Sequence, residues 1–361
     1  MNKTLHQIAN RFEIPSTVTK VEPLGAGFIN DTYIARTDNP EEKYILQKKN
    51  KNIFPEVEAM MENILAVTDH IRRKVEASGG DVDREVMTVV KTSDGLPYFV
   101  DEDGEYWTVS KFIEGSVTYE RADSMELAYK GGKGIGKFQS LLADFEGELS
   151  ETIKGFHNIR HRFQQWDEAL ERNAAGRRDT LSEEIEWIES RREKMLDFWS
   201  LVEKGIIPKR VTHNDTKISN ILFDSAGEVL CVIDLDTVMS STSLNDFGDA
   251  IRSYANTGAE DERDLENVEI DLEMFEAYTR GYLEERNSTL LEEEKERLAF
   301  AALYITFEQV LRFLMDYIDG DTYYKTAYPE HNLVRTHAQY KLLRSMEDNY
   351  EKMCAIVASL L

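Results

Sequence analysis

The chain has 361 residues, of which 43 are basic and 68 acidic, so its formal net charge is −25 at pH 7. Hydrophobic residues make up 41% and aromatic residues 10%, a composition typical of globular proteins with a sizeable core, which excludes a fibrous or disordered chain. Because so negative a surface repels phosphate backbones and anionic lipids, we expect neither nucleic acid nor a membrane as a partner. A small anion bound in a locally basic pocket is not excluded.

The two cysteines, Cys231 and Cys354, form no CxxC pair and no disulfide framework, which indicates reduced thiols. The first 15 residues contain no apolar run of signal-peptide length, and no uninterrupted apolar stretch of about 18 residues occurs in the chain. We therefore expect a soluble, cytoplasmic protein, and nothing in the sequence calls for an obligate protein partner.

The first third of the chain has the β-branched content and the turn residues of a strand meander. Strands are predicted at 18–23, 29–35 and 43–47, with a glycine turn between the first two. A helix opened by Pro55 follows, with apolar residues at helical spacing. Two further strands are predicted at 86–90 and 106–113.

From about residue 123 onward the pattern changes to long amphipathic helices, interrupted by one short β segment at 210–238. This order predicts an α+β protein with two lobes. The first lobe, 1–112, carries an antiparallel sheet and one helix, and the second, 113–361, is mainly helical with one hairpin.

Polar side chains with the spacing of a kinase catalytic loop lie in this β interruption. Asp215 is followed five residues later by Asn220, and Asp234 comes fourteen residues further on, at the end of an apolar strand. Kinases use one carboxylate to accept the hydroxyl proton, and an amide with a second carboxylate to hold Mg²⁺. The alternative, a polar loop that only satisfies its own backbone, does not explain three matched roles at these offsets.

The sequence resembles a known family at these residues. HNDTKISNILFD at 213–224 and VIDLDT at 232–237 are similar to the aminoglycoside-phosphotransferase superfamily, which has a protein-kinase-like fold, and more closely to its N-acetylhexosamine 1-kinase group. Matching segments include GAGFINDTYIA at 25–35, RFLMDYIDGDTYY at 312–324 and YPEHNLVRTHAQ at 328–339, so the resemblance extends over almost the whole chain.

The resemblance implies an ATP- and Mg²⁺-dependent kinase that phosphorylates the anomeric 1-hydroxyl of GlcNAc or GalNAc, a small-molecule sugar. Asp215 would be the catalytic base, and Asn220 and Asp234 the metal ligands. The implied nucleotide-binding residues are Gly25, Gly27, Gln47, Ile113 and Glu114, and the implied substrate residues are Phe28, Asp215, Arg312 and Tyr323.

Several of these residues have simpler interpretations. The two glycines alone would indicate only a hairpin turn, Arg312 a cation on a helix surface, and Tyr323 a core aromatic residue. The same fold could also act on another hydroxyl acceptor such as choline, homoserine or an aminoglycoside. A catalytically inactive nucleotide-binding protein is a third possibility, which the intact Asp215 disfavours.

The chain departs from related patterns at a few positions. The slot of the strand lysine that protein kinases use holds Gln47, followed by Lys48 and Lys49. Phe28 and Ser253 replace a histidine and an aromatic residue of the sugar-kinase pattern. Two glutamates of the first helix, Glu58 and Glu62, are equal candidates for the usual partner of a strand lysine.

Three motifs are predicted not to carry chemistry. Residues 131–137 nearly spell a phosphate-binding loop, but Phe138 stands where Ser or Thr is needed, so these glycines are expected to be close-packing points on a helix. Asp246 begins a literal DFG, yet it lies 26 residues after Asn220, and we expect it to cap the next helix and brace the catalytic loop. His157 and His161 lack a third ligand and are predicted to be solvated or capping residues. His213 is predicted to organise the catalytic loop.

Overall fold

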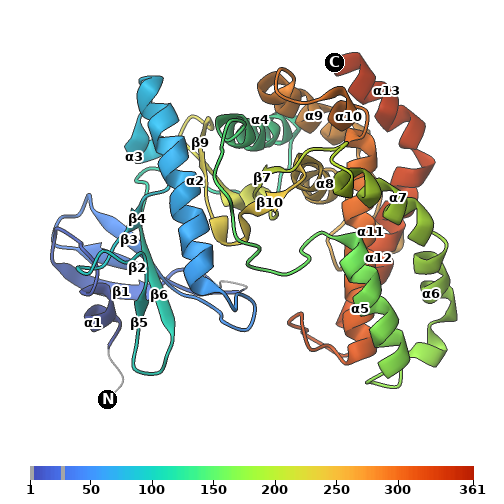
Figure 1. The fold of residues 1–361 in the computed structure, drawn as a ribbon, viewed down its shortest axis with the longest axis horizontal. Helices are drawn as coiled ribbons and strands as arrows, with labels where there is room; N and C mark the ends of the chain where they lie inside the picture. The colour runs from blue at the N-terminus through green and yellow to red at the C-terminus, as the bar shows by residue number, and fades with distance from the viewer. Residues whose placement is uncertain (1–3, 26–28) are drawn as a thin grey trace. The chain divides into compact units, whose positions relative to one another are not determined.

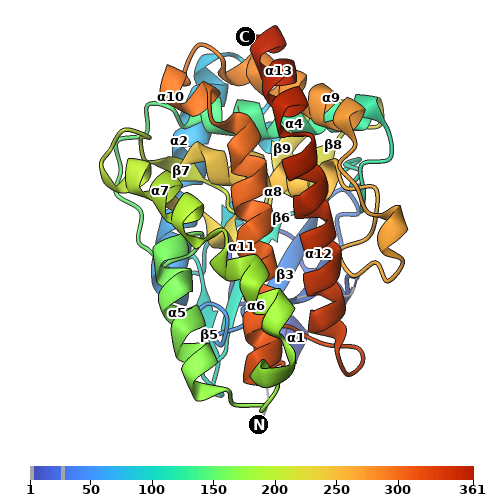
Figure 2. The ribbon, with the colours of Figure 1, turned by 90° about the vertical axis from the view of Figure 1, so that its right-hand side faces the viewer.

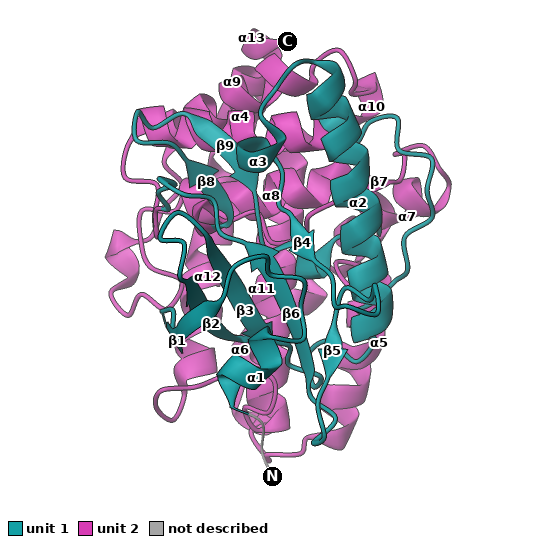
Figure 3. Ribbon diagram, turned by 90° about the vertical axis from the view of Figure 1, so that its left-hand side faces the viewer, with its two compact units in different colours: residues 1–118, 141–154, 220–240 teal, residues 119–140, 155–219, 241–361 magenta. Residues whose placement is uncertain are grey.

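The computed structural model describes residues 4–25 and 29–361. The chain forms two compact units, coloured separately in Figure 3. The first unit contains residues 1–118, 141–154 and 220–240, and the second contains 119–140, 155–219 and 241–361. The predicted lobes were continuous, whereas the first unit extends past residue 112 and includes two later segments.

The first unit is built on an antiparallel sheet with the order β1-β2-β3-β6-β4, to which β5 adds through β6. The predicted antiparallel sheet is confirmed. Its strands are β1 (Val18–Pro23), β2 (Asp31–Thr37), β3 (Lys43–Lys48), β4 (Val89–Val90), β5 (Phe99–Val100) and β6 (Tyr106–Lys111).

Four of the five predicted strands lie within two residues of the observed ones at each end. The prediction at 86–90 is wrong for most of its length, because Val86 ends the short helix α3 (Val82–Glu85) and only two residues pair with β6. A short N-terminal helix, α1 (Leu5–Ala9), packs against the sheet, and a shared core of Ala35, Leu46 and Val109 is fully or almost fully buried.

One long helix and one hairpin complete the first unit. Helix α2 (Val57–Ala77) runs beside the strands (Figures 1 and 3), and the hydroxyl of Tyr106 on β6 donates to Glu58 of this helix at 3.1 Å. The hairpin is formed by β8 (Ile221–Phe223) and β9 (Val229–Val232), followed by a 3₁₀ turn, η3 (Leu235–Thr237). This unit therefore holds the segment that carries Asn220 and Asp234.

The second unit is mainly helical, as predicted. Figure 2 shows α11 (Leu298–Asp319) flanked by α5 (Ile159–Arg172) and α12 (His331–Asp348). Its other elements are α4 (Met125–Leu141), η1 (Arg178–Thr180), α6 (Ser182–Glu189), α7 (Arg192–Glu203), β7 (Arg210–Thr212), η2 (Ile218–Asn220), β10 (Met239–Ser241), α8 (Ser243–Tyr254), η4 (Leu265–Asn267), α9 (Leu272–Arg286), α10 (Glu292–Lys295) and α13 (Tyr350–Leu360), with η2 and β10 at its boundary.

Helix α11 is the one helix of the described residues that is long and apolar enough to cross a membrane. However, 94% of its most apolar 18-residue window is buried inside the protein. A helix as apolar and as buried as this one is expected at the centre of a large helical core, and most of its few polar side chains, such as Glu308 and Arg312, are buried as well.

The glycine-rich segment at 131–137 is helical, as predicted, and forms part of α4. A Cβ atom added at Gly132 would lie 2.1 Å from the carbonyl oxygen of Tyr278, and one at Gly136 would lie 2.9 Å from that of Tyr282. The backbones of α4 and α9 therefore approach too closely for side chains, which confirms the close-packing interpretation.

Candidate functional site

The loop that carries Asp215 lies in the second unit, directly after β7. The backbone N–H of Asp215 donates to Nδ1 of the fully buried His213 at 3.2 Å, so His213 organises the loop as predicted. The Asp215 side chain is 32% exposed, and one of its oxygens lies 2.9 Å from Nζ of Lys217. Asp215 is thus partly accessible to solvent and has a cation directly beside it.

Two buried carboxylates of α8 hold this loop. Asp246 accepts hydrogen bonds from the backbone N–H groups of His213 at 3.0 Å and Asn214 at 2.7 Å. Asp249 accepts one from the N–H of Thr216 at 2.8 Å. The prediction that Asp246 braces the loop is confirmed, but it does not cap the helix: Thr242 is the N-cap.

The electrostatics of the two carboxylates differ. Burial raises the pKa of Asp246, although the neighbouring His213 and the backbone N–H donors oppose the rise. Burial acts in the same direction on Asp249, but Arg252, whose guanidinium lies 3.1 Å away, outweighs it and the pKa of Asp249 is lowered. Asp249 is therefore a fixed negative charge next to the loop.

A second buried cluster, which we call the Glu308 cluster, consists of His157, Arg162 and Glu308. One Glu308 oxygen lies 2.7 Å from Nδ1 of His157 and the other accepts from Nε of Arg162 at 3.1 Å. Nε2 of His157 lies 3.3 Å from the carbonyl oxygen of Asn214, the residue before Asp215. The cluster thus links α5 and α11 to the loop that carries Asp215.

The expectation for His157 was wrong. It is 4% exposed and precedes helix α5, so it does not share a helix face with His161, which lies on α5. Its φ of 56° and the φ of 67° at Asn214 are both left-handed. Non-glycine residues keep such conformations only where the surroundings hold them, as they often do at functional sites.

Arg312 lies on α11 and is 9% exposed, so the interpretation as a helix-surface cation is wrong. Its guanidinium carbon lies 5.5 Å from the ring centres of Phe156 and Tyr324 and 5.7 Å from that of Tyr323. Tyr323 is 48% exposed and is therefore no core residue. Arg312 and Tyr323, two of the predicted substrate residues, are therefore neighbours in the second unit.

Asn220 and Asp234 come together in the first unit at the base of the β8–β9 hairpin. Ile221 pairs with Val232, and the N–H of Ile233 donates to the carbonyl oxygen of Asn220 at 2.9 Å. Asn220 is buried and Asp234 exposed. One amide and one carboxylate, the hard oxygen donors that Mg²⁺ prefers, thus lie just before β8 and just after β9, at the same end of the hairpin.

No group of three or more His, Cys, Asp and Glu side chains with metal-binding geometry occurs among the described residues. An Asn–Asp pair fits a Mg²⁺ ion that keeps most of its ligands from phosphates and water, and does not fit a closed structural metal site.

The predicted nucleotide-binding residues are distributed over the first unit. Ile113 packs against Leu222 and Cys231 of the hairpin. Glu114 forms an ion pair with Lys43 at 2.9 Å, and its carbonyl oxygen accepts from Arg84. Their predicted contact with adenine stays a prediction.

The glycine turn is described only in part. Gly25 has a φ of 66°, the left-handed conformation that glycine adopts without strain. The other predicted residues of this turn, Gly27 and Phe28, lie outside the described residues.

A buried ion pair in the first unit was not predicted. Nζ of Lys49 lies 2.8 Å from both carboxylate oxygens of Asp236 and 2.8 Å from Oε1 of Gln47. Gln47, at the position of the strand lysine of protein kinases, thus accepts a hydrogen bond from Lys49, two residues later. The spacing of Asp234 and Asp236 did not indicate that the side chain of Asp236 is buried and paired with a lysine.

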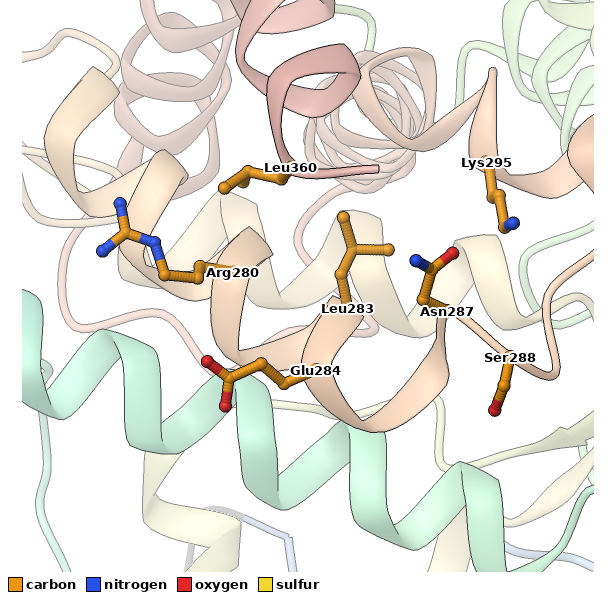
Figure 4. Close-up of a pocket in the computed structure, with 7 residues that line it drawn as sticks. All are labelled: Arg280, Leu283, Glu284, Asn287, Ser288, Lys295 and Leu360. Carbon is orange, nitrogen blue, oxygen red and sulfur yellow. The ribbon is translucent and has the colours of Figure 1, made fainter.

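An open hollow of about 590 Å³ on the second unit is unrelated to these residues (Figure 4). Two of the side chains that line it, Arg280 and Lys295, already form ion pairs with Glu276 and Glu292. It contains none of the predicted site residues.

Comparisons with known proteins identify the family and the fold of the chain. The profile of the phosphotransferase enzyme family, APH, matches residues 20–287. A microcompartment-associated aminopropanol kinase has a similar structure, with a TM-score of 0.65 and 16% identity, over 96% of this chain and 97% of that one.

Two aminoglycoside phosphotransferases are also similar in fold. The enzyme from Alicyclobacillus acidocaldarius has a TM-score of 0.59 and 12% identity, over 100% of this chain and 96% of that one. The ADP-bound APH(2'')-Ib has a TM-score of 0.52 and 16% identity, over 91% and 95%. At these identities the three structures establish the fold, with its antiparallel-sheet and helical parts.

Proposed function

Because this chain belongs to the phosphotransferase enzyme family, we propose that it is an ATP- and Mg²⁺-dependent kinase that phosphorylates the anomeric 1-hydroxyl of an N-acetylhexosamine, GlcNAc or GalNAc. The observation that supports phosphoryl transfer is the pairing of Asn220 with the Asp234 segment at the hairpin base, together with the braced Asp215 loop. Cytoplasmic location and action without an obligate protein partner stay predictions.

In this proposal Asp215 accepts the proton of the acceptor hydroxyl while that oxygen attacks the γ-phosphorus of ATP. The bond between the γ-phosphorus and the β,γ-bridging oxygen breaks, and ADP leaves. Asn220 and Asp234 would hold Mg²⁺, which neutralises phosphate charge when bound. Gly25, just after β1, and Gln47, on β3, would belong to the part of the first unit that covers the nucleotide.

The preference for a neutral acceptor rests on Arg312. Its buried guanidinium forms no ion pair with a carboxylate within 4.0 Å among the described residues, and aromatic rings surround it. A buried cation disfavours an ammonium group nearby, whereas it donates well to the hydroxyl or acetamide oxygens of an amino sugar. Choline and aminoglycosides carry ammonium groups, so this feature favours the sugar.

An acceptor panel tests the proposal. The purified protein is incubated with Mg-ATP and GlcNAc, GalNAc, choline, homoserine or kanamycin, and ADP release is measured. We expect ADP with at least one hexosamine and a sugar 1-phosphate by phosphorus NMR. ADP release only with choline, homoserine or kanamycin would show that the acceptor is not an N-acetylhexosamine. A sugar phosphorylated at a hydroxyl other than the 1-hydroxyl would overturn the proposed position of transfer.

A further inference from the structure

The pair formed by Lys49 and Asp236 is nearly closed to solvent. The exposed fraction is 3% for the Lys49 side chain and 7% for that of Asp236. Nζ donates to both carboxylate oxygens at 2.8 Å, and Nδ2 of Asn30 donates to one of them at 2.7 Å. Both oxygens of Asp236 are therefore already occupied by protein donors.

The lysine end of the pair is equally well held. Its third donor bond goes to Gln47, whose amide nitrogen in turn lies 3.3 Å from the hydroxyl of Thr32 on β2. The amide oxygen of Asn30 accepts from the backbone N–H of Asn50 at 3.1 Å. Asp236 is thus bound to residues next to the ends of two sheet strands, Asn30 before β2 and Lys49 after β3.

The carboxylate end lies in the turn that presents the proposed metal ligand. Asp236 is the central residue of η3, and Asp234, directly before this turn, has φ 59° and ψ 56°. A left-handed non-glycine residue costs about 1–3 kcal/mol and needs surrounding contacts to hold it. On the far side of the turn, Asn63 of α2 donates to the carbonyl oxygen of Val238 at 3.0 Å.

Stability alone does not explain the pair. A buried ion pair is often no more stable than two well-packed apolar residues of the same volume, because both charges lose their hydration. The structure also shows that the lysine does not pair with α2: Glu58 accepts from Tyr106, and Glu62 is exposed. Lys49 instead pairs with Asp236, in the turn that directly follows the proposed metal ligand Asp234.

We propose that Lys49 and Asp236 are positioning residues that hold Asp234 in its left-handed conformation and thereby set the affinity for Mg²⁺ with nucleotide. Asp236 acts through the backbone and is no metal ligand. The inference rests on the proposed function at one point, because it takes Asp234 to be a ligand of Mg²⁺.

The test separates positioning from stability with three variants: K49M, D236N and the double variant K49M/D236N. Urea unfolding gives the stability of each, and calorimetry gives the Kd of ADP with and without Mg²⁺. Each single variant leaves a buried group without its partner and is expected to lose stability, whereas the double variant recovers it. We expect all three to bind Mg²⁺ about 10–100-fold more weakly, as for other residues that orient a metal ligand.

The matched control is K51M. Lys51 lies beyond the same strand end but is 39% exposed and pairs with Glu105, so its loss should leave the Mg²⁺ dependence unchanged. A stable double variant with wild-type Mg²⁺ dependence would overturn the inference. Because binding is measured with ADP, a wild-type protein that binds Mg-ADP but phosphorylates no acceptor would overturn the proposed function alone. A wild-type protein whose ADP affinity does not depend on Mg²⁺ would overturn both.

Discussion

Each unit contains a buried ion pair whose carboxylate has protein donors on both oxygens, and the two pairs are connected to the candidate site differently. In the first unit the carboxylate, Asp236, lies in the loop itself, and the cation comes from a strand end. In the second, Glu308 lies on the central helix α11 and reaches the loop through His157.

Both connections end beside a left-handed residue, Asp234 in one unit and Asn214 in the other. The difference indicates what each cluster does. The Glu308 cluster joins helices of the main core, so its loss should affect the fold, whereas the Lys49–Asp236 pair holds one turn, so its loss should affect mainly metal binding.

The largest expected effect comes from Asp215→Asn, which removes the proposed base from the loop that the Glu308 cluster supports. Turnover should fall about 10²–10⁴-fold, the usual contribution of general base catalysis, while nucleotide binding is retained. ADP release and calorimetry measure the two quantities. Full activity in this variant would show that Asp215 is not the catalytic base.

Glu308→Gln should strongly destabilise the second unit. It leaves Arg162 and His157 buried without their carboxylate, and the loss of one partner of a buried pair costs about 3–5 kcal/mol. Urea unfolding measures it. The control is Glu203→Gln, which breaks an exposed pair with Arg160 and should cost no more than about 1 kcal/mol. Equal losses in both variants would contradict the comparison.

The same carboxylate predicts a pH dependence. Burial alone would raise the pKa of Glu308, but His157, Arg162 and Arg312 lower it from 4.5 to about 2. A depressed folded-state pKa stabilises the protein above the unfolded-state value, and this contribution, on the order of 3 kcal/mol, is lost as the pH falls from about 4.5 towards 2. Unfolding free energies measured through this window should fall more steeply for the wild type than for Glu308→Gln, and parallel curves would contradict the assignment.

Arg312→Met should have a smaller, acceptor-specific effect. Loss of a charged hydrogen-bond donor costs about 1.5–3 kcal/mol, which corresponds to a rise of about 10–150-fold in KM for the hexosamine. The KM for ATP should not change. An unaltered hexosamine KM would show that Arg312 does not contact the acceptor.

Local sequence patterns predicted those parts of the protein whose structure depends on residues close to one another in the sequence. The strands at 18–23 and 43–47, the helical glycine segment of α4 and the Asp215–Asn220 spacing all follow from short-range rules. The strand predicted at 86–90 was too long, because Val86 is the C-cap of α3 and only Val89 and Val90 pair with β6.

The sequence by itself determined the α+β class, the family resemblance and the order of the catalytic motif, because these depend on residue type and spacing. Only the tertiary structure decided which charges are buried and paired. Lys49 and Asp236 are 187 positions apart, and His157 and Glu308 are 151 apart. Periodicity cannot show that such residues meet, since their partnership and their burial depend on how distant segments pack.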